Sequence, residues 1–246
     1  MASECILRLE VLDYFKFVIP VYVLELLAAL AGTIYLRKIL KLSVPTKYFV
    51  WFLWYTLVSE LVANYAVIGY FTEYEYFSFV EGTNFQRSKW IYNIVTLVSA
   101  VFFTIYFSHF IGNKILKILL KYLLGFFIVT SVVNFIITDV FFTEDSKYVN
   151  LTGTFLVFLS IVFFYFEILR SDLLLNLKRY LPVYVSIGVL VYYLCMTPLS
   201  IFSDYFNQEN ETYVALQSHL VLYSNLFMYS FFILGFYICS RTTKYS

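Results

Sequence analysis

Seven long apolar stretches, separated by short polar linkers, constrain this 246-residue chain more than any other feature. A helix needs about 20 apolar residues to cross the roughly 30 Å hydrocarbon core of a bilayer. The predicted spans are residues 15–36, 48–71, 90–111, 122–138, 151–169, 180–202 and 213–239. Because 61% of the residues are hydrophobic, a soluble helical bundle would expose too much apolar surface. We therefore predict an all-α, polytopic membrane bundle of seven transmembrane helices, forming a single domain over residues 1–246.

Lysine and arginine are distributed unevenly between the two sides of this predicted bundle. Twelve of the 17 basic residues lie in the linkers after the first, third and fifth spans and in the C-terminal tail. Short loops rich in Lys and Arg stay in the cytoplasm, so we predict an N-terminus outside and a cytoplasmic C-terminus. The residues before Phe15 are acidic rather than basic, unlike a signal peptide. We expect the first apolar stretch to be retained as a span.

The basic residues of the predicted inner side form a candidate cytoplasmic docking surface. It would bind a signalling partner or anionic lipid head groups, although membrane insertion alone accounts for the same asymmetry. The candidate residues are Arg37, Lys38, Lys41, Lys114, Lys117, Arg170, Lys178 and Arg179.

Two carboxyl side chains fall near the middle of the first two spans, at Glu25 and Glu60. Ionisable groups at this depth are costly and face the bundle interior. Low dielectric disfavours the charged form, so we expect one or both carboxyls to carry a proton. Two interpretations remain open, namely neutral carboxyls that link helices and a proton, cation or ligand site. With polar residues at helical spacing around them, the candidate site comprises Glu25, Glu60, Asn64, Thr56, Tyr22, Asn93 and Asn225.

Several features limit the possible function. Pro198 falls inside the sixth span, where it removes a backbone hydrogen bond and is a candidate hinge. The chain has three Cys and two His without metal-ligand spacing, so we expect no metal and no cofactor. Paired aspartates, a nucleophile with its base and a phosphate-binding loop are also missing from the sequence. We therefore expect a protein that is not an enzyme and does not bind nucleic acid.

Short aromatic-rich motifs in the third to sixth spans carry one resemblance. They are Tyr92-Asn93-Ile94, Tyr165-Phe166-Glu167-Ile168-Leu169, Asn176-Leu177-Lys178 and Ser186-Ile187-Gly188. In these motifs the chain resembles an uncharacterised family of small seven-helix bacterial integral membrane proteins, some of them encoded near sensor histidine kinases. The resemblance implies a bacterial inner-membrane protein with a sensory or accessory role. Polar residues in the outer halves of several spans indicate an outward-opening polar pocket, and because no linker can hold a signalling domain, we expect a cytoplasmic or membrane signalling partner. The alternative is a small proton- or cation-linked transporter or channel that uses Glu25 and Glu60.

Overall fold

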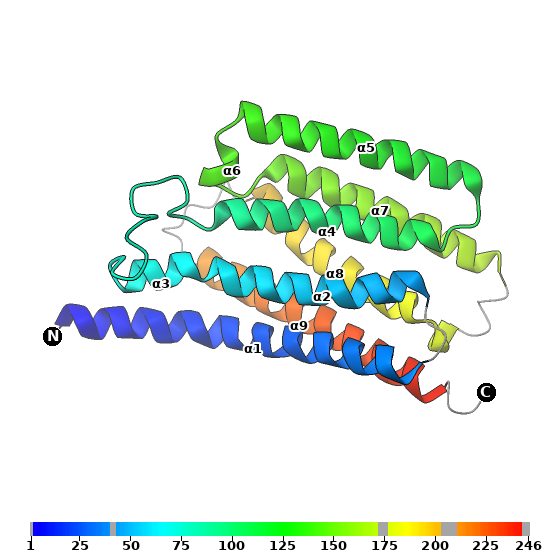
Figure 1. The fold of residues 1–246 in the computed structure, drawn as a ribbon, viewed down its shortest axis with the longest axis horizontal. Coiled ribbons are helices and arrows are strands. Elements are labelled where there is room, and N and C mark those ends of the chain that lie inside the picture. The colour runs from blue at the N-terminus through cyan, green and yellow to red at the C-terminus, as the bar shows by residue number, and fades with distance from the viewer. Residues whose placement is uncertain (1, 40–42, 172–176, 203–210, 243–246) are drawn as a thin grey trace.

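The chain folds into a bundle of long helices that run side by side (Figure 1). The computed structural model describes residues 2–39, 43–171, 177–202 and 211–242, and this part contains helices and no strands. The helices are α1 (Ala2–Lys38), α2 (Val44–Ala63), α3 (Tyr65–Phe71), α4 (Lys89–His109), α5 (Lys114–Ile137), α6 (Val140–Thr143), α7 (Lys147–Leu169), α8 (Leu181–Phe202) and α9 (Glu211–Thr242). The start of α1 and the end of α9 lie at opposite ends of the bundle.

Seven segments of the described chain are long and apolar enough to cross a membrane, as the hydropathy pattern predicts. They are Lys16–Lys38, Val44–Phe71, Lys89–His109, Lys114–Ile137, Lys147–Leu169, Leu181–Phe202 and Ala215–Arg241. The all-helical prediction is therefore confirmed. Helices satisfy every main-chain hydrogen bond within one segment, which is what a lipid environment requires.

The start of the fourth span differs from the prediction, because α5 begins eight residues earlier, at Lys114 rather than residue 122. Asn113 caps the helix through its side-chain oxygen, which accepts hydrogen bonds from the backbone N–H groups of Ile115 and Leu116. Because of this cap, the helix begins before the first residue of the apolar stretch. Lys114 and Lys117 consequently lie on a helix rather than in a linker.

The second span is broken at Asn64, where the sequence predicts one continuous helix over residues 48–71. The Asn64 side-chain amide donates a 3.1 Å hydrogen bond to the Glu60 carbonyl, which a regular helix reserves for the backbone. The same amide nitrogen donates to the Tyr22 hydroxyl at 2.8 Å. At the break the regular helix is interrupted, and the Asn64 side chain forms a hydrogen bond to Tyr22 on α1.

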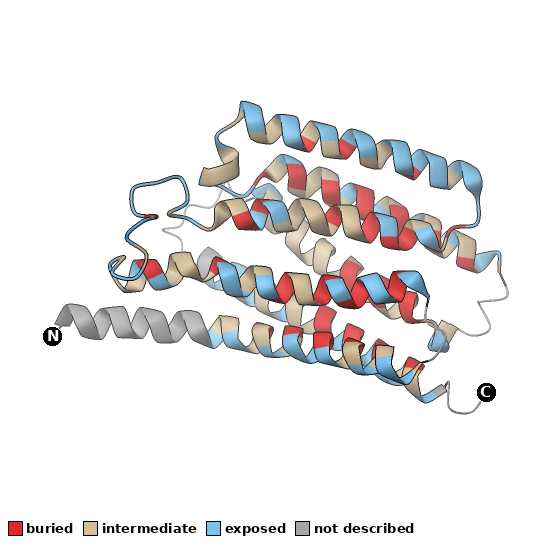
Figure 2. Cartoon of the chain, in the orientation of Figure 1, coloured by how far each residue is buried: buried red, intermediate tan, exposed pale blue. Residues whose placement is uncertain are grey.

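Six helices form a closed ring in the order α1, α2, α4, α7, α8 and α9, with each helix packed on the next and α9 on α1. The seventh long helix, α5, lies outside this ring against α4 and α7. Figure 2 shows that most of α5 is exposed. The exposed residues of this helix include the large apolar side chains of Phe126 and Ile136. In a bilayer this surface contacts acyl chains.

Five fully buried phenylalanines fill the ring interior towards the end where Lys38 and Arg241 lie. This aromatic plug consists of Phe49, Phe107, Phe164, Phe232 and Phe236. The Phe49 ring lies 5.1 Å from that of Phe232 and 5.8 Å from that of Phe236, and the Phe107 and Phe164 rings are 5.5 Å apart. Aromatic pairs contribute about 0.5–1.5 kcal/mol each beyond area burial. The plug therefore packs this half of the bundle tightly with aromatic rings, among them the buried Tyr106, whose ring lies 5.5 Å from that of Phe49.

Candidate functional site

A buried carboxyl group on α1 is the centre of the candidate site. Glu25 is 1% exposed, and its Oε1 accepts a short hydrogen bond from the Tyr229 hydroxyl on α9. α1 and α9 pack closely along their length, which brings these two side chains together. The second oxygen, Oε2, is also buried and has no hydrogen-bond partner in the described part of the chain. No hydroxyl, amide or basic donor of the described residues reaches this oxygen, and the neighbouring group that interacts with the Glu25 carboxyl is the Glu60 carboxyl.

A second carboxyl and a second phenol complete the group. The Glu60 carboxyl on α2 and the Tyr192 hydroxyl on α8 both lie close enough to Glu25 for direct electrostatic interaction. We call Glu25, Glu60, Tyr192 and Tyr229 the carboxyl cluster. Its members come from four of the six ring helices. Among the described residues, no lysine or arginine pairs with either carboxyl.

The cluster lies near mid-depth in the bundle. Glu25 is 13 residues from Lys38, and Tyr229 is 12 residues from Arg241. At a rise of 1.5 Å per residue, both lie about 18–20 Å from the basic end of their helices. Two adjacent carboxylates without a cation repel strongly at such depth. Chemically, the cluster can hold a shared proton or accept a small cation between its oxygens.

Two further residues of the predicted site lie one turn nearer the N-terminal end of the bundle. The hydrogen bond from Asn64 to Tyr22 joins the α2–α3 break to α1. Asn64 also contacts the main chain of Glu60, so this pair adjoins the carboxyl cluster. The structure therefore brings together Glu25, Glu60, Asn64 and Tyr22.

The remaining predicted site residues have local partners. The buried Thr56 hydroxyl donates to the Leu53 carbonyl of its own helix at 2.9 Å. The Asn225 amide likewise donates to the Val221 carbonyl at 2.8 Å, within α9. Neither bond reaches the carboxyl cluster.

Asn93 has a separate, structural position at the start of α4. Its amide nitrogen donates to the carbonyls of Phe141 (3.1 Å) and Glu144 (2.9 Å), while its oxygen accepts from the Ser146 backbone N–H at 2.9 Å. The side chain is 2% exposed. Asn93 thus fixes the connection from α6 to α7 rather than contributing to the cluster.

The candidate hinge, Pro198, lies inside α8, and the helix continues past it to Phe202. The neighbouring Thr197 hydroxyl donates to the Tyr193 carbonyl at 2.6 Å. Pro198 itself is exposed. Its role as a hinge stays a prediction.

The predicted docking residues gather at one end of the bundle, opposite the N-terminus in Figure 1. The exposed residues there are Arg37, Lys38, Lys114, Lys117, Arg170, Lys178 and Arg179, whereas Lys41 lies outside the described residues. We call this surface the basic end. The Arg170 guanidinium stacks over the Phe166 ring, 4.0 Å from the ring centroid. This contact holds one positive charge of the basic end in place.

Sequence reasoning missed Tyr192 entirely and did not include Tyr229 in the site. The chain contains 24 tyrosines, and a phenol suits an apolar core as well as a polar site. Tyr229 does lie four residues after Asn225, on the same helical face. That spacing is the one signal that points to it.

Comparisons with family models, with curated proteins and with solved structures found no match to this chain. The fold itself defines the class, since seven long apolar helices are the architecture of a multi-pass integral membrane protein. The function must therefore be argued from the carboxyl cluster and its surroundings.

Proposed function

We propose that this protein is a non-enzymatic sensory or signalling accessory protein of a bacterial inner membrane. Its N-terminus would lie outside and its C-terminus in the cytoplasm. In this proposal the carboxyl cluster detects the stimulus and the basic end contacts a signalling partner. The observation that carries the proposal is that one cluster, in which Glu25 and Tyr229 are buried and Glu60 and Tyr192 half-buried, joins α1, α2, α8 and α9.

The cluster has the chemistry of a two-state element. With a proton between them, Glu25 and Glu60 attract, and without one they repel. Two unit charges about 4 Å apart repel by about 4 kcal/mol at an effective dielectric constant of 20. Moving a two-state equilibrium from 1:99 to 99:1 requires about 5.5 kcal/mol. Gain or loss of one proton would supply most of this free energy, and about 4 kcal/mol shifts a packing equilibrium roughly a thousandfold.

The surroundings of the cluster favour access from one side. The Tyr22–Asn64 pair extends the polar group towards the N-terminal end of the bundle. In the other direction the aromatic plug separates the cluster from the basic end. A transporter needs polar access on both sides, whereas a sensor needs access on the stimulus side alone. The arrangement thus supports the sensory proposal.

The distribution of basic residues supports the proposed orientation and the proposed contact of the basic end with a partner. Twelve of the 17 basic residues belong to the linkers and the tail that this orientation assigns to the cytoplasm, and the start of α1 and the end of α9 lie at opposite ends of the bundle. A cytoplasmic reporter fused after Ser246 should therefore be active. An inactive reporter on a correctly inserted protein would overturn the orientation.

Spin labels can test the proposed movement. In a chain whose three cysteines are replaced by alanine, one label is attached at Tyr48→Cys on α2 and one at Leu169→Cys on α7. Both positions are exposed. α2 carries Glu60 and α7 carries no cluster residue, so the distance between the labels reports movement of α2. The distances are measured in proteoliposomes as the external pH is lowered from about 8 to about 5.

We expect the distance distribution to change with external pH in the parent chain. Glu60→Gln should abolish the change, whereas Glu75→Gln, which alters an exposed carboxyl far from the cluster, should preserve it. A distribution that is independent of pH in the parent chain would refute the sensory proposal.

The second candidate is a small proton- or cation-linked transporter or channel. The observation that favours it is a pair of interacting carboxyls, Glu25 and Glu60, that no basic side chain of the described residues accompanies. The same proteoliposomes distinguish the two functions. Ion or solute flux that Glu60→Gln abolishes would favour transport, and conformational change without flux would favour the sensor.

A further inference from the structure

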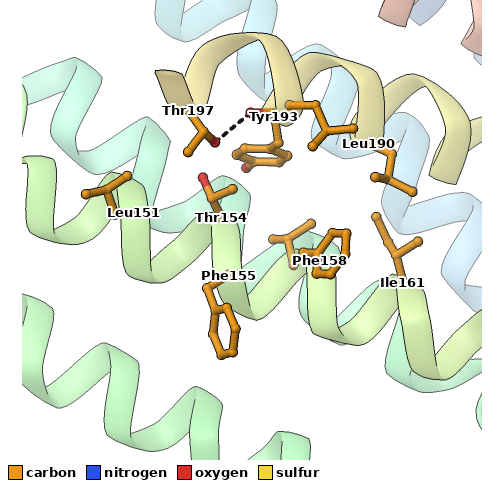
Figure 3. A pocket seen from close by; sticks show the side chains of 10 residues that line it. Leu151, Thr154, Phe155, Phe158, Ile161, Leu190, Tyr193 and Thr197 are labelled. Carbon is orange, nitrogen blue, oxygen red and sulfur yellow. Dashed lines mark hydrogen bonds between the residues drawn. The ribbon is translucent and has the colours of Figure 1, made fainter. Parts of the chain in front are cut away.

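A cavity of about 240 Å³ lies between α7 and α8, on the opposite face of α8 from the carboxyl cluster. Figure 3 shows side chains from both helices around it, including Thr154, Phe158, Ile161 and Tyr193. Its walls are almost entirely apolar. The space is open at the outside of the bundle, where Phe155 and Leu194 are exposed. Enclosed apolar cavities of about 150 Å³ already hold benzene, so the volume here is sufficient for a ring.

The Thr154 hydroxyl is the unusual feature of this cavity. Its oxygen is buried and has no hydrogen-bond partner in the described part of the chain. Threonines in this bundle ordinarily donate to the carbonyl four residues earlier, as Thr33 does at 2.8 Å and Thr104 at 2.7 Å. Thr154 does not make this bond, and in Figure 3 its hydroxyl points towards α8. A buried hydroxyl without a partner costs about 1–3 kcal/mol, which a ligand oxygen would offset.

The polar and apolar groups lie at different ends of the cavity. Thr154, Tyr193 and Thr197 gather at one end, and Ile161 and Leu190 lie at the other. Thr154 and Ile161 are seven residues apart on α7, which is about 10 Å along the helix. The cavity therefore fits a molecule with one polar end and an apolar remainder.

The depth of Thr154 in the bundle limits which kinds of molecule can reach its hydroxyl. The exposed ion pair between Lys89 and Asp145, with N and O 2.7 Å apart, marks the aqueous boundary just before α7 begins at Lys147. Thr154 is seven residues further along α7, about 10 Å deeper. A phospholipid keeps its charged head group and ester carbonyls at the boundary. A ligand that reaches Thr154 must carry an uncharged oxygen into the hydrocarbon layer.

We propose that this cavity is a binding site for a neutral ring compound with a carbonyl oxygen and an apolar tail, the chemistry of an isoprenoid quinone. The Thr154 hydroxyl donates to the carbonyl, and Phe158 and Tyr193 contact the ring. The tail follows Ile161 and Leu190 along the groove. This binding is independent of the function proposed for the carboxyl cluster.

Equilibrium binding of decylubiquinone to the full chain in lipid nanodiscs tests the proposal. Thr154→Val removes the hydroxyl and keeps the side-chain volume, so affinity should fall about three- to tenfold. Leu190→Trp fills the apolar end and should abolish saturable binding. The matched control is Thr130→Val on α5, because the Thr130 hydroxyl already bonds its own helix at 2.9 Å and lies far from the cavity. It should bind like the parent chain.

Photolabelling of the parent chain avoids dependence on variants that fold poorly. A decylubiquinone analogue with a diazirine group should label peptides of α7 and α8, and excess decylubiquinone should suppress the labelling. Three results would overturn the proposal. They are equal affinity in Thr154→Val and the parent chain, labelling spread over the exposed face of α5, and equal displacement of the probe by a phospholipid or by hexadecane.

Discussion

Replacing Asn93 by alanine should destabilise the protein more than any other loss of a single polar side chain discussed above. Asn93 makes two hydrogen bonds of 2.9 Å, one to the Glu144 carbonyl and one from the Ser146 backbone N–H. A weaker bond of 3.1 Å reaches the Phe141 carbonyl. Together they hold α4 against the connection between α6 and α7. A fourth bond, of 3.3 Å, reaches the Val140 carbonyl, and the substitution removes all four at once.

The expected loss of stability follows from the burial of Asn93 and its hydrogen-bond partners. Each of the two shorter bonds contributes about 1 kcal/mol net, and a buried donor left without a partner costs about 1–3 kcal/mol. Ser146 is 3% exposed, so its N–H cannot recover a bond from water. We expect Asn93→Ala to lower the free energy of unfolding by about 3 kcal/mol. Unfolding by SDS in mixed micelles, followed by circular dichroism, measures this difference.

The matched control is Asn225→Ala. The Asn225 amide bonds a carbonyl of its own helix, which keeps its backbone partner when the side chain is removed. Its loss should cost less than about 1 kcal/mol. If Asn93→Ala and Asn225→Ala cost the same, the structural role assigned to Asn93 is wrong.

Three further predictions concern packing, the carboxyl cluster and the hinge. Gly235→Val should weaken α8–α9 packing, because a Cβ there would lie 2.7 Å from Tyr184 Cβ; Gly125→Val, with open space around it, should be tolerated in the same SDS titration. Glu60→Gln should express and unfold within about 1 kcal/mol of the parent chain, since a neutral amide replaces a carboxyl that has no cation partner; loss of folded protein on size-exclusion chromatography would instead reveal a paired charge. Pro198→Ala should raise the free energy of unfolding, by at most about 3 kcal/mol, and should diminish the pH-dependent change in spin-label distance if α8 bends there; an unchanged response would exclude the hinge.

Much of the fold is accessible from the sequence because a lipid environment leaves few alternatives. An apolar stretch of sufficient length must form a helix there, so all seven spans were predictable. The proximity of Glu25 and Glu60 was also predictable, because a short linker makes their helices neighbours and both fall near mid-depth. Ends of helices were less predictable, since α5 begins at the Asn113 cap rather than at the first apolar residue.

Other features depend on contacts that hydropathy does not report. The break at Asn64 arises from a side chain that bonds both its own helix and Tyr22 on another. Asn93 was expected within the polar site, because helical spacing does not reveal that the connection between α6 and α7 folds over it. Tyr192 gave no signal, since a phenol near a carboxyl and a phenol in an apolar core look the same in sequence.

Adjacent tyrosines on α8 have a mechanical consequence. Tyr192 lies near the carboxyl cluster and Tyr193 lines the cavity against α7, and their rings touch at a centroid distance of 5.5 Å. Consecutive residues of a helix are about 100° apart around its axis, so the two rings are rigidly attached to one rod. Any rotation of α8 must displace both rings by the same angle. A probe attached to either face of α8 would therefore report on events at the other.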